Sequence, residues 1–259
     1  MEKNNKRVAI ITGSANGIGK SIAEKFINQN MIVILVDLDE KNLKKTILEI
    51  DPLKQNTISA KLDISSEQDI EQLKSIVEKK FGYLDILVNN AGIAPNRLIE
   101  DQNLDEWEKV IKVNLTGTFL CSKMAVGIMK EKKNKMKYIL NITSISGSVG
   151  SVGRSAYGVS KAGIIQLTKQ MAVEFAEYNI LVNSISPGPV NTKLTKNSDE
   201  ATKSYISRIP LKRFTEKKSI ASAATFLTSE ECDFITGHTL NIDGGFLAGG
   251  INFPKKDLK

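Results

Sequence analysis

Short apolar runs alternate with longer amphipathic stretches along most of the chain. The apolar runs have the length of buried strands, and the stretches between them repeat apolar side chains at helical spacing. We predict strands near residues 7–12, 31–36, 57–62, 84–88, 136–143, 180–186 and 238–242. We predict helices near residues 17–29, 40–50, 66–81, 103–130, 155–177 and 216–228. This alternation is typical of an α/β fold whose parallel sheet, here seven-stranded and doubly wound, has helices on both faces.

Few other signals interrupt this alternation. Ser65 and Gln68 have the spacing of a capping box at the start of the third helix, and Gly82 stands where the C-terminal cap of that helix belongs. The polar stretch 191–214 follows no clear pattern, and loops of that length are often functional lids; a loop without function is the alternative. Because no repeat or linker divides the chain, we expect residues 1–259 to form one domain with a substrate loop near 191–214.

Composition narrows the classes of protein. The net charge is +7, but the lysines are scattered apart from the dense stretch 130–137, so we expect a solvated surface and no binding of nucleic acid. The two cysteines are far apart and form no CxxC pair, so we expect reduced thiols and no metal site. The N-terminus lacks a secretory signal, and no apolar run reaches the roughly 18–20 residues of a membrane span. We therefore expect a cytoplasmic protein that makes no membrane contact.

A glycine-rich turn follows the first apolar run. Residues 12–19 read Thr-Gly-Ser-Ala-Asn-Gly-Ile-Gly and lead directly into an amphipathic stretch. A strand, a glycine turn and a helix N-terminus form a phosphate site, because backbone N–H groups point at the ligand and glycine lets the backbone approach it. A tight strand–helix connection is the alternative. Asp37 ends the second strand, eighteen residues after Gly19, where an acidic residue is expected to bind the ribose hydroxyls of an adenosine.

Tyr157 and Lys161 are four residues apart in a predicted helix, so both side chains lie on one face, one turn apart. An ammonium close to a phenol favours the phenolate and lowers the pKa of the phenol, and a tyrosine tuned in this way can transfer a proton near neutral pH. Ser144 ends the apolar run 138–144, and its hydroxyl can hold a carbonyl or hydroxyl oxygen for that tyrosine. Taken alone, the pair also fits an amphipathic surface helix.

Together these motifs resemble the short-chain dehydrogenase/reductase family, in its branch of single-domain enzymes with a Tyr-x-x-x-Lys pair. The similarity extends from about Arg7 to Gly245, and its markers occur in family order. The resemblance implies a Rossmann-like fold that binds a nicotinamide dinucleotide. The markers are the glycine turn 12–19, Asp63, the Asn-Asn-Ala-Gly segment 89–92, Asn114, Ser144, Tyr157 with Lys161, and Pro187 with Gly188.

The resemblance also implies roles for these residues. Asn114 would kink its helix so that an exposed carbonyl holds a water near Lys161. Asp63 and Ile64 would contact the adenine, and Thr192 would contact the nicotinamide carboxamide or a phosphate. The catalytic residues implied in this way are Asn114, Ser144, Tyr157 and Lys161. The implied cofactor-binding residues are Gly13, Asn16, Ile18, Gly19, Asp37, Asp63, Ile64, Asn90, Ala91, Gly92, Tyr157, Lys161, Pro187, Gly188, Val190 and Thr192.

The resemblance favours an NAD-dependent oxidoreductase that interconverts a secondary alcohol and a ketone, with Tyr157 as the general acid/base. Asp37 favours NAD over NADP, because a 2′-phosphate would meet a like charge. The main alternative is a 3-oxoacyl-[acyl-carrier-protein] reductase that uses NADPH, and Lys135 and Tyr178 stand where such reductases tend to carry arginines that dock the carrier protein. A dinucleotide-binding regulator without turnover is a second alternative, although both Tyr157 and Lys161 are present.

The sequence argues against a serine hydrolase and indicates which segments select the substrate. A Ser-His triad needs a histidine, and the only one, His238, precedes the last strand, far from the site by analogy. We expect a small-molecule alcohol or ketone, selected by residues 94–98, residues 145–154 and the loop 191–214. Arg154 either faces an anionic substrate or lies in solvent.

The resemblance further implies a homotetramer. The helices 103–130 and 155–177 would pack at one two-fold interface, and the segment 244–253 at a second. The broad apolar surface of helix 155–177 supports this assembly, and closed symmetric oligomers are the common soluble form.

Overall fold

The computed structural model describes residues 6–131, 135–190 and 199–249. Its sheet has the strand order β3-β2-β1-β4-β5-β6-β7, and every pairing is parallel. All seven predicted strands are confirmed, with ends that differ by at most two residues from the prediction. The strands are β1 (Val8–Thr12), β2 (Ile32–Asp37), β3 (Thr57–Lys61), β4 (Ile86–Asn89), β5 (Lys137–Ile142), β6 (Ile180–Pro187) and β7 (Thr239–Ile242).

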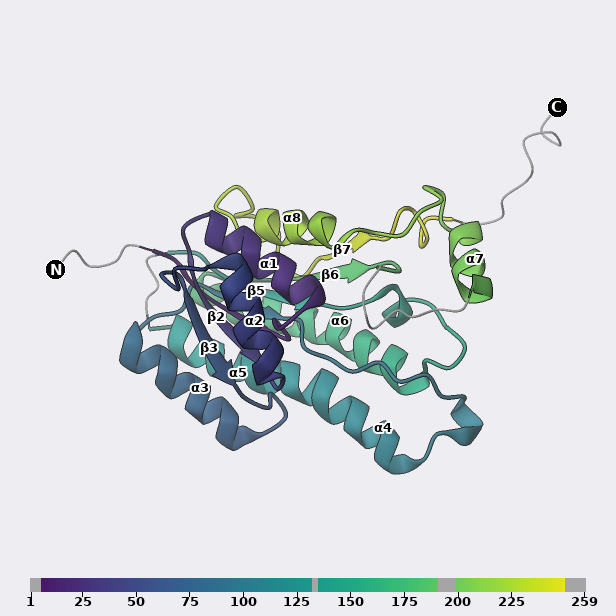
Figure 1. Cartoon of the computed structure of the whole chain (residues 1–259), viewed down its shortest axis with the longest axis horizontal. Helices are drawn as coiled ribbons and strands as arrows, with labels where there is room; N and C mark the ends of the chain where they lie inside the picture. The colour runs from purple at the N-terminus through teal and green to yellow at the C-terminus, as the bar shows by residue number, and fades with distance from the viewer. Residues whose placement is uncertain (1–5, 132–134, 191–198, 250–259) are drawn as a thin grey trace.

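Helices cover both faces of the sheet, as Figure 1 shows. On one face α1 (Gly17–Asn28) packs between α2 (Glu40–Ile50) and α8 (Lys217–Leu227). On the other face α5 (Gly117–Met129) packs between α3 (Glu67–Lys80) and α6 (Ser155–Phe175). Two further helices, α4 (Leu104–Ile111) and α7 (Asp199–Arg208), lie toward one end of the molecule (Figure 1).

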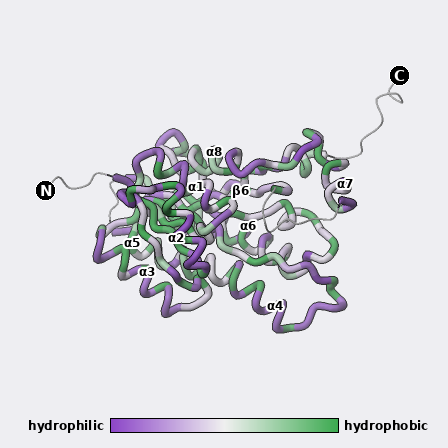
Figure 2. Tube along the Cα trace, in the orientation of Figure 1, coloured by the Kyte–Doolittle hydropathy of each residue, from purple (hydrophilic) through white to green (hydrophobic). Residues whose placement is uncertain are grey.

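The central strands are apolar because both of their faces are covered. In β1 all five residues are buried. Ala9 and Ile11 face the core formed with α1, α2 and α8, whereas Val8 and Ile10 face the core formed with α3, α5 and α6. Figure 2 shows hydrophobic segments in the interior and hydrophilic positions along the outer helices.

The strand order places a crevice at the carboxyl edge of the sheet. The chain runs outward from β1 to β2 and β3, and then crosses to β4 on the other side of β1. Loops that leave β1 and β4 therefore diverge, and in open α/β sheets ligands bind in the crevice formed at such a reversal. The topology of the backbone alone thus places a ligand site at this edge of the sheet.

The ends of α3 differ in part from the prediction. Ser66, not Ser65, is the N-cap, and its hydroxyl accepts a hydrogen bond from Asp69 N at 3.3 Å. The predicted capping box is wrong because Ser65 donates both its N–H and its hydroxyl to Asp63 Oδ1, at 2.8 Å each. The predicted C-terminal cap is confirmed, since Gly82 has a φ of 69° and donates its N–H to the Val77 carbonyl.

The structure differs from the prediction in two longer segments, 103–130 and 191–214. The helix expected at 103–130 is divided into α4 and α5 by a π-helical turn, Lys112–Thr116. The stretch expected as a loop at 191–214 contains α7, whose polar sequence gave no clear helical pattern; residues 191–198, and with them Thr192, lie outside the described residues.

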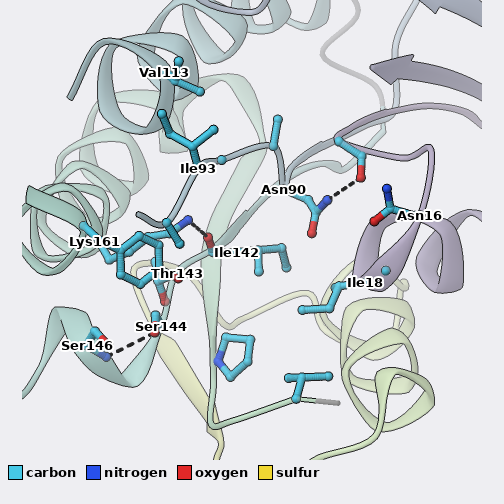
Figure 3. A pocket seen from close by; sticks show the side chains of 18 of the residues that line it. Asn16, Ile18, Asn90, Ile93, Val113, Ile142, Thr143, Ser144, Ser146 and Lys161 are labelled. Carbon is cyan, nitrogen blue, oxygen red and sulfur yellow. Dashed lines mark hydrogen bonds between the residues drawn. The ribbon is translucent and has the colours of Figure 1, made fainter. Parts of the chain in front are cut away.

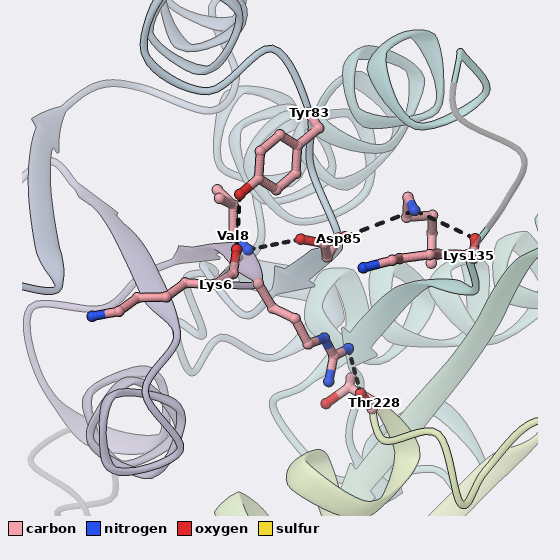
Figure 4. Close-up of polar contacts among 8 residues, drawn as sticks. Lys6, Val8, Tyr83, Asp85, Lys135 and Thr228 are labelled. Carbon is pink, nitrogen blue, oxygen red and sulfur yellow. Dashed lines mark hydrogen bonds and ion pairs between the residues drawn. The ribbon is translucent and has the colours of Figure 1, made fainter. Parts of the chain in front are cut away.

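The amino edge of the sheet, opposite the crevice, is held by a charged network (Figure 4). Asp85, just before β4, accepts a hydrogen bond from Val8 N at 2.8 Å and lies 3.7 Å from the buried ammonium of Lys137. Arg7 donates to the Thr228 carbonyl at 2.6 Å. These contacts join β1, β4, β5 and the end of α8 and so stabilise the amino edge of the sheet. The crevice lies at the opposite, carboxyl edge.

Candidate active site

A cleft of about 390 Å³ opens at the carboxyl edge of the sheet. Gly19 and Asn114 lie behind its wall, and Thr192 falls outside the described residues. Every other predicted site residue lines the cleft, so the structure brings together residues at the carboxyl ends of β1 to β6 and residues of α6. These residues are Gly13, Asn16, Ile18, Asp37, Asp63, Ile64, Asn90, Ala91, Gly92, Ser144, Tyr157, Lys161, Pro187, Gly188 and Val190.

The three glycines of the turn after β1 have different tasks. Gly13 has a φ of 63°, and a Cβ there would lie 2.7 Å from Ala91 Cα. A Cβ on Gly19 would lie 2.4 Å from the Gly13 carbonyl oxygen, so Gly19 is required for packing. Gly17 also has a φ of 63°, but a Cβ there would meet nothing within 4 Å and would point into open space. Gly13 and Gly19 therefore build the turn, and Gly17 leaves room beside it.

The N-terminus of α1 is suited to an anion. Asn16 is the N-cap and has extended backbone, and its side chain makes no capping hydrogen bond. The N–H groups of the first helical turn therefore need other partners, and the helix dipole favours negative charge at this end. Backbone N–H groups at a helix N-terminus beside a glycine turn fit a pyrophosphate.

The adenosine end of the predicted site is built by the loops after β2 and β3. Asp37 Oδ2 accepts a hydrogen bond from Ala15 N, and Asp37 Oδ1 accepts one from Asp39 N, both at 3.0 Å. These two contacts hold the carboxylate at the rim of the cleft, and Leu38 beside it is 61% exposed. An acidic group in this place fits ribose hydroxyls, which can donate hydrogen bonds to it.

Thr12 is a positioning residue that the sequence did not single out. Its hydroxyl oxygen accepts hydrogen bonds from Asn90 N at 3.0 Å and Ala91 N at 3.1 Å. In return the Asn90 carboxamide donates to the carbonyls of Thr12 and Gly13, each at 2.9 Å. These contacts fix the end of β4 against the glycine turn, across the reversal in strand order. The only signal in the sequence was the place of Thr12 at the start of the turn.

Three of the proposed catalytic residues, Ser144, Tyr157 and Lys161, line the other end of the cleft, where Figure 3 shows Ser144 and Lys161. Ser144 follows β5, and its hydroxyl accepts a hydrogen bond from Ser146 N at 3.2 Å. Lys161 Nζ lies 5.7 Å from the centroid of the Tyr157 ring and donates to the Ile142 carbonyl at 2.8 Å. The helical spacing therefore places Tyr157 and Lys161 side by side and facing Ser144, as the sequence predicts.

The ionisation of Tyr157 differs from the sequence-based prediction. Burial is the largest effect and raises the pKa of Tyr157 above its ordinary value, although a hydrogen bond with Ser144 and the Arg154 guanidinium lower it. Lys161 is 4% exposed, and burial lowers its own pKa to about 8. The expected lowering of the phenol's pKa by the Lys161 ammonium is therefore not found: burial outweighs the two groups that lower this pKa, Ser144 and Arg154.

Asn114 lies in the π-helical turn and holds the loop after β4. Its Oδ1 accepts a hydrogen bond from Ile93 N at 2.8 Å, and its Nδ2 donates to the Ile93 carbonyl and to Ser160 Oγ, each at 3.0 Å. Its main-chain carbonyl accepts a hydrogen bond from Thr118 Oγ1 at 2.7 Å. The expected helix distortion is present, and the contacts of Asn114 are those of a positioning residue between the cleft and α6.

Tyr205, on α7, lines the cleft and was missed by the sequence analysis because its segment was expected to be a loop. Its ring lies 6.3 Å from the ring of Phe214 and 6.4 Å from that of Phe246. An aromatic residue within a polar stretch was the signal that could have identified it. This cluster places α7 against the half of the cleft that contains Tyr157.

Other chemistries find little support in the described residues. His238 directly precedes β7 and so lies at the amino edge of the parallel sheet, away from Ser144. Both cysteines, Cys121 and Cys232, are free and buried. Within the described ranges no group of three His, Cys, Asp or Glu side chains could hold a metal ion. In the same part of the chain, no helix has the length and apolar character of a membrane span.

The fold and the cleft define a Rossmann-like α/β dinucleotide-binding enzyme, with the cleft at the reversal in strand order. The chain belongs to the short-chain dehydrogenase/reductase family. The family model described as "Enoyl-(Acyl carrier protein) reductase" matches residues 13–247. The protein is thus an oxidoreductase that acts on CH–OH groups with a nicotinamide dinucleotide.

Curated relatives and a solved structure agree with this assignment. The chain is 38% identical to the 3-oxoacyl-[acyl-carrier-protein] reductase FabG of Thermotoga maritima, over 93% of this chain and 98% of the relative. It is 36% identical to glucose 1-dehydrogenase 2 of Bacillus subtilis, over 92% and 94% of the two chains. The crystal structure of a short chain dehydrogenase from Bacillus anthracis matches with a TM-score of 0.89 at 31% identity, over 96% of this chain and 98% of that one.

Proposed function

We propose that this protein is an NAD-dependent oxidoreductase that interconverts a secondary alcohol and a ketone, with Tyr157 as the general acid/base. One observation carries the proposal: a single cleft joins the Asp37 carboxylate at one end to Ser144, Tyr157 and Lys161 at the other. The first group selects the adenosine half of a dinucleotide, and the other three can serve proton transfer at an oxygen.

The bound nicotinamide ring supplies the hydride chemistry, and the chain supplies position, charge and a proton. The Ser144 hydroxyl holds the oxygen of the reacting alcohol or ketone. In the direction of reduction, Tyr157 donates its proton to that oxygen. Burial raises the pKa of Tyr157, so the phenol keeps its proton until the substrate oxygen accepts it. In the direction of oxidation the same phenolate accepts the proton, and the nearby Lys161 ammonium stabilises it.

The choice of NAD rests on the surroundings of Asp37. Its carboxylate is fixed by Ala15 N and Asp39 N, and the exposed neighbour Leu38 carries no charge. A 2′-phosphate there would face the carboxylate and would remove a hydroxyl donor. We further propose that Thr192 contacts the nicotinamide carboxamide or a phosphate of the cofactor.

A 3-oxoacyl-[acyl-carrier-protein] reductase is the second candidate. It is favoured by the 38% identity to the Thermotoga maritima relative of that name. Of the two positions expected to dock an acidic carrier protein, Lys135 is exposed and basic, whereas Tyr178 is neutral. The Asp37 carboxylate argues against NADPH.

We propose a homotetramer with a two-fold interface across α5 and α6. These helices border a shallow groove whose surface is mostly apolar. It is lined by Leu115, Thr116, Phe119, Gly163, Gln166, Leu167 and Gln170. On these two helices Phe119 is 46% and Val159 50% exposed, although both side chains are apolar. An equal face on a second chain would cover them.

Steady-state assays with NAD and NADP test the proposed function. The alcohols are hydroxysteroids, sugars and hydroxy acids, and 3-oxoacyl thioesters are assayed in the direction of reduction with NADH and NADPH. Each compound is assayed with wild-type protein and the Tyr157→Phe variant. We expect turnover of at least one secondary alcohol with NAD and its loss in the variant. Turnover of thioesters alone, with NADPH, would support the second candidate. Cofactor binding without turnover of any compound would support a regulator.

A further inference from the structure

Arg154 lies in the wall of the cleft beside Tyr157. Its Nη1 donates a hydrogen bond to the Ala94 carbonyl at 2.9 Å, and its guanidinium carbon lies 5.4 Å from the centroid of the Tyr157 ring. The side chain is partly buried, and it lines the cleft together with Ser144 and Tyr205. Arg154 therefore lies in the half of the cleft where the reacting oxygen would bind.

The positive charge of Arg154 has no ion-pair partner among the described residues. The acidic residues that line the cleft, Asp37 and Asp63, follow β2 and β3, on the far side of the reversal in strand order. The neighbouring Arg97 is different, since its guanidinium is half exposed and lies 3.0 Å from Glu106. One arginine of this region is thus neutralised within the chain, and the other is not.

The surroundings of Arg154 strengthen any interaction with an anion. Ile93, Ala94, Val113 and Ile145 form apolar walls of the same cleft. Charges attract more strongly where such walls exclude water. Within the described part of the chain, one donor of the guanidinium is committed, to the Ala94 carbonyl. A guanidinium has several N–H groups in a planar fork that matches a carboxylate.

On the basis of the proposed function, we propose that Arg154 binds a carboxylate of the substrate. The protein then acts on a short hydroxy acid and the matching oxo acid, with the carboxylate within a few bonds of the reacting carbon. That spacing follows from the position of the guanidinium beside the ring whose hydroxyl reaches the reacting oxygen.

The reaction balances without any further reactant. The carbinol carbon of the hydroxy acid loses a hydride to NAD, and the hydroxyl loses its proton to Tyr157, which passes it on to solvent. The C–H and O–H bonds break and a C=O bond forms, so the products are the oxo acid, NADH and one proton. The carboxylate keeps its charge throughout, and Arg154 therefore binds substrate and product alike.

Two other roles for Arg154 predict different results. A purely structural role, through Ala94, would affect all substrates equally. A role in the ionisation of Tyr157 would change the pH profile of kcat for charged and neutral substrates alike. The test therefore compares each acid with its own methyl ester, which has the same reacting carbon and no charge. The pairs are 2-oxobutanoate and 3-oxobutanoate, each with its methyl ester, assayed with NADH.

The measured quantity is the ratio of kcat/KM for the acid to that for the ester. We expect the wild-type protein to prefer the acid of at least one pair, and Arg154→Gln to reduce the ratio by about 10- to 100-fold, the effect of a hydrogen bond to a charged group. Arg154→Lys should give an intermediate ratio, because it keeps the charge and loses the fork. The control Lys169→Gln, which removes an exposed positive charge from α6 outside the cleft, should keep the wild-type ratio.

A binding measurement gives the same test without turnover. Calorimetric titration of the NAD-saturated protein with malonate should show saturable binding that Arg154→Gln weakens at least about tenfold. Dimethyl malonate, the neutral control, should bind the two proteins alike. Saturation with NAD fills the anion site at the N-terminus of α1, so that malonate reports the substrate half of the cleft.

The outcomes separate this inference from the proposed function. If the esters are reduced as well as the acids and malonate binding does not depend on Arg154, the carboxylate site is refuted while the oxidoreductase stands. If no compound is reduced but malonate binding depends on Arg154, the anion site is supported and the proposed reaction is not. An acid-to-ester ratio unchanged in Arg154→Gln, with both rates reduced, would leave Arg154 a structural role and overturn the inference.

Discussion

Lys161 Nζ donates a hydrogen bond to the main-chain carbonyl of Ile142 at 2.8 Å. Among the described residues no carboxylate lies within ion-pair distance of this ammonium. The ammonium is thus held by the sheet itself, at the end of β5 (Figure 3). A buried amine with one neutral partner is readily deprotonated, and its pKa is accordingly lowered to about 8.

The stability of the cofactor-free protein should therefore depend on pH through Lys161. The unfolded chain keeps this proton up to pH ~10.4, whereas the folded chain loses it near pH 8. Between these values the unfolded state binds more protons, so the free energy of unfolding rises with pH. Compared with Lys161→Met, the wild type should gain about 3 kcal/mol across this window, as measured by urea unfolding at a series of pH values.

Lys169 provides the control, because it lies on the same helix and is exposed. The difference between wild type and Lys169→Met should be flat with pH. A flat difference for Lys161→Met as well would mean that Lys161 keeps an ordinary pKa in the folded protein. Lys161→Met should also lose both rate and cofactor affinity, since one ammonium serves both.

Tyr157→Phe should lose turnover and retain cofactor binding. Removal of the proposed acid/base should lower kcat by ~10²–10⁴-fold. The glycine turn and Asp37 remain, so the dissociation constant of NADH, measured by fluorescence titration, should change little. A variant that keeps more than about a tenth of the wild-type kcat would show that another group transfers the proton.

The wild-type protein should have a kcat/KM at least ~10²-fold greater with NAD than with NADP, because Asp37 repels a 2′-phosphate and loses a hydroxyl donor. Asp37→Ser combined with Leu38→Arg should reverse part of this preference, since a guanidinium binds phosphate. The single variant Leu38→Arg is the control for the added charge. Equal efficiency of the wild type with both cofactors contradicts the prediction and favours the carrier-protein reductase.

Light scattering at micromolar concentration should give four times the mass of one chain. Phe119→Glu should reduce the mass, because it places a charge on the exposed apolar surface of α5 that the second chain would cover. Leu53→Glu is the matched control, since Leu53 is 76% exposed near the end of α2, on the other face of the sheet. A monomeric wild type would refute the tetramer.

The sequence predicted the fold because the strands are continuous apolar runs and the helices have period 3.6. It also predicted most of the residues of the cleft, because the ends of parallel strands meet at one edge. It could not predict Ser66 as the cap of α3, since Asp63 competes for Ser65 through a local turn. Nor could it decide between solvent and substrate for Arg154, whose position depends on the distant Ala94 loop.

Tyr157 shows a different limit. The helical spacing identified Lys161 as the neighbour of Tyr157. The pKa of Tyr157, however, depends on how deeply its ring is buried. The burial of the ring depends in turn on the packing of α6, β5 and α7 around the cleft. Tyr205 was missed for a related reason, because α7 lacks the periodic apolar face by which the other helices were identified.

The glycine-rich turn after β1 carries two kinds of evolutionary constraint within three residues. A Cβ at Gly19 would lie 2.4 Å from the Gly13 carbonyl oxygen, so any side chain there would disturb the turn and destabilise the folded protein. Gly17 faces open space, so a methyl group there leaves the packing intact; it adds the backbone strain of a positive φ and narrows the room for a ligand. Selection on abundance would therefore remove substitutions at Gly19, and selection on activity would remove them at Gly17.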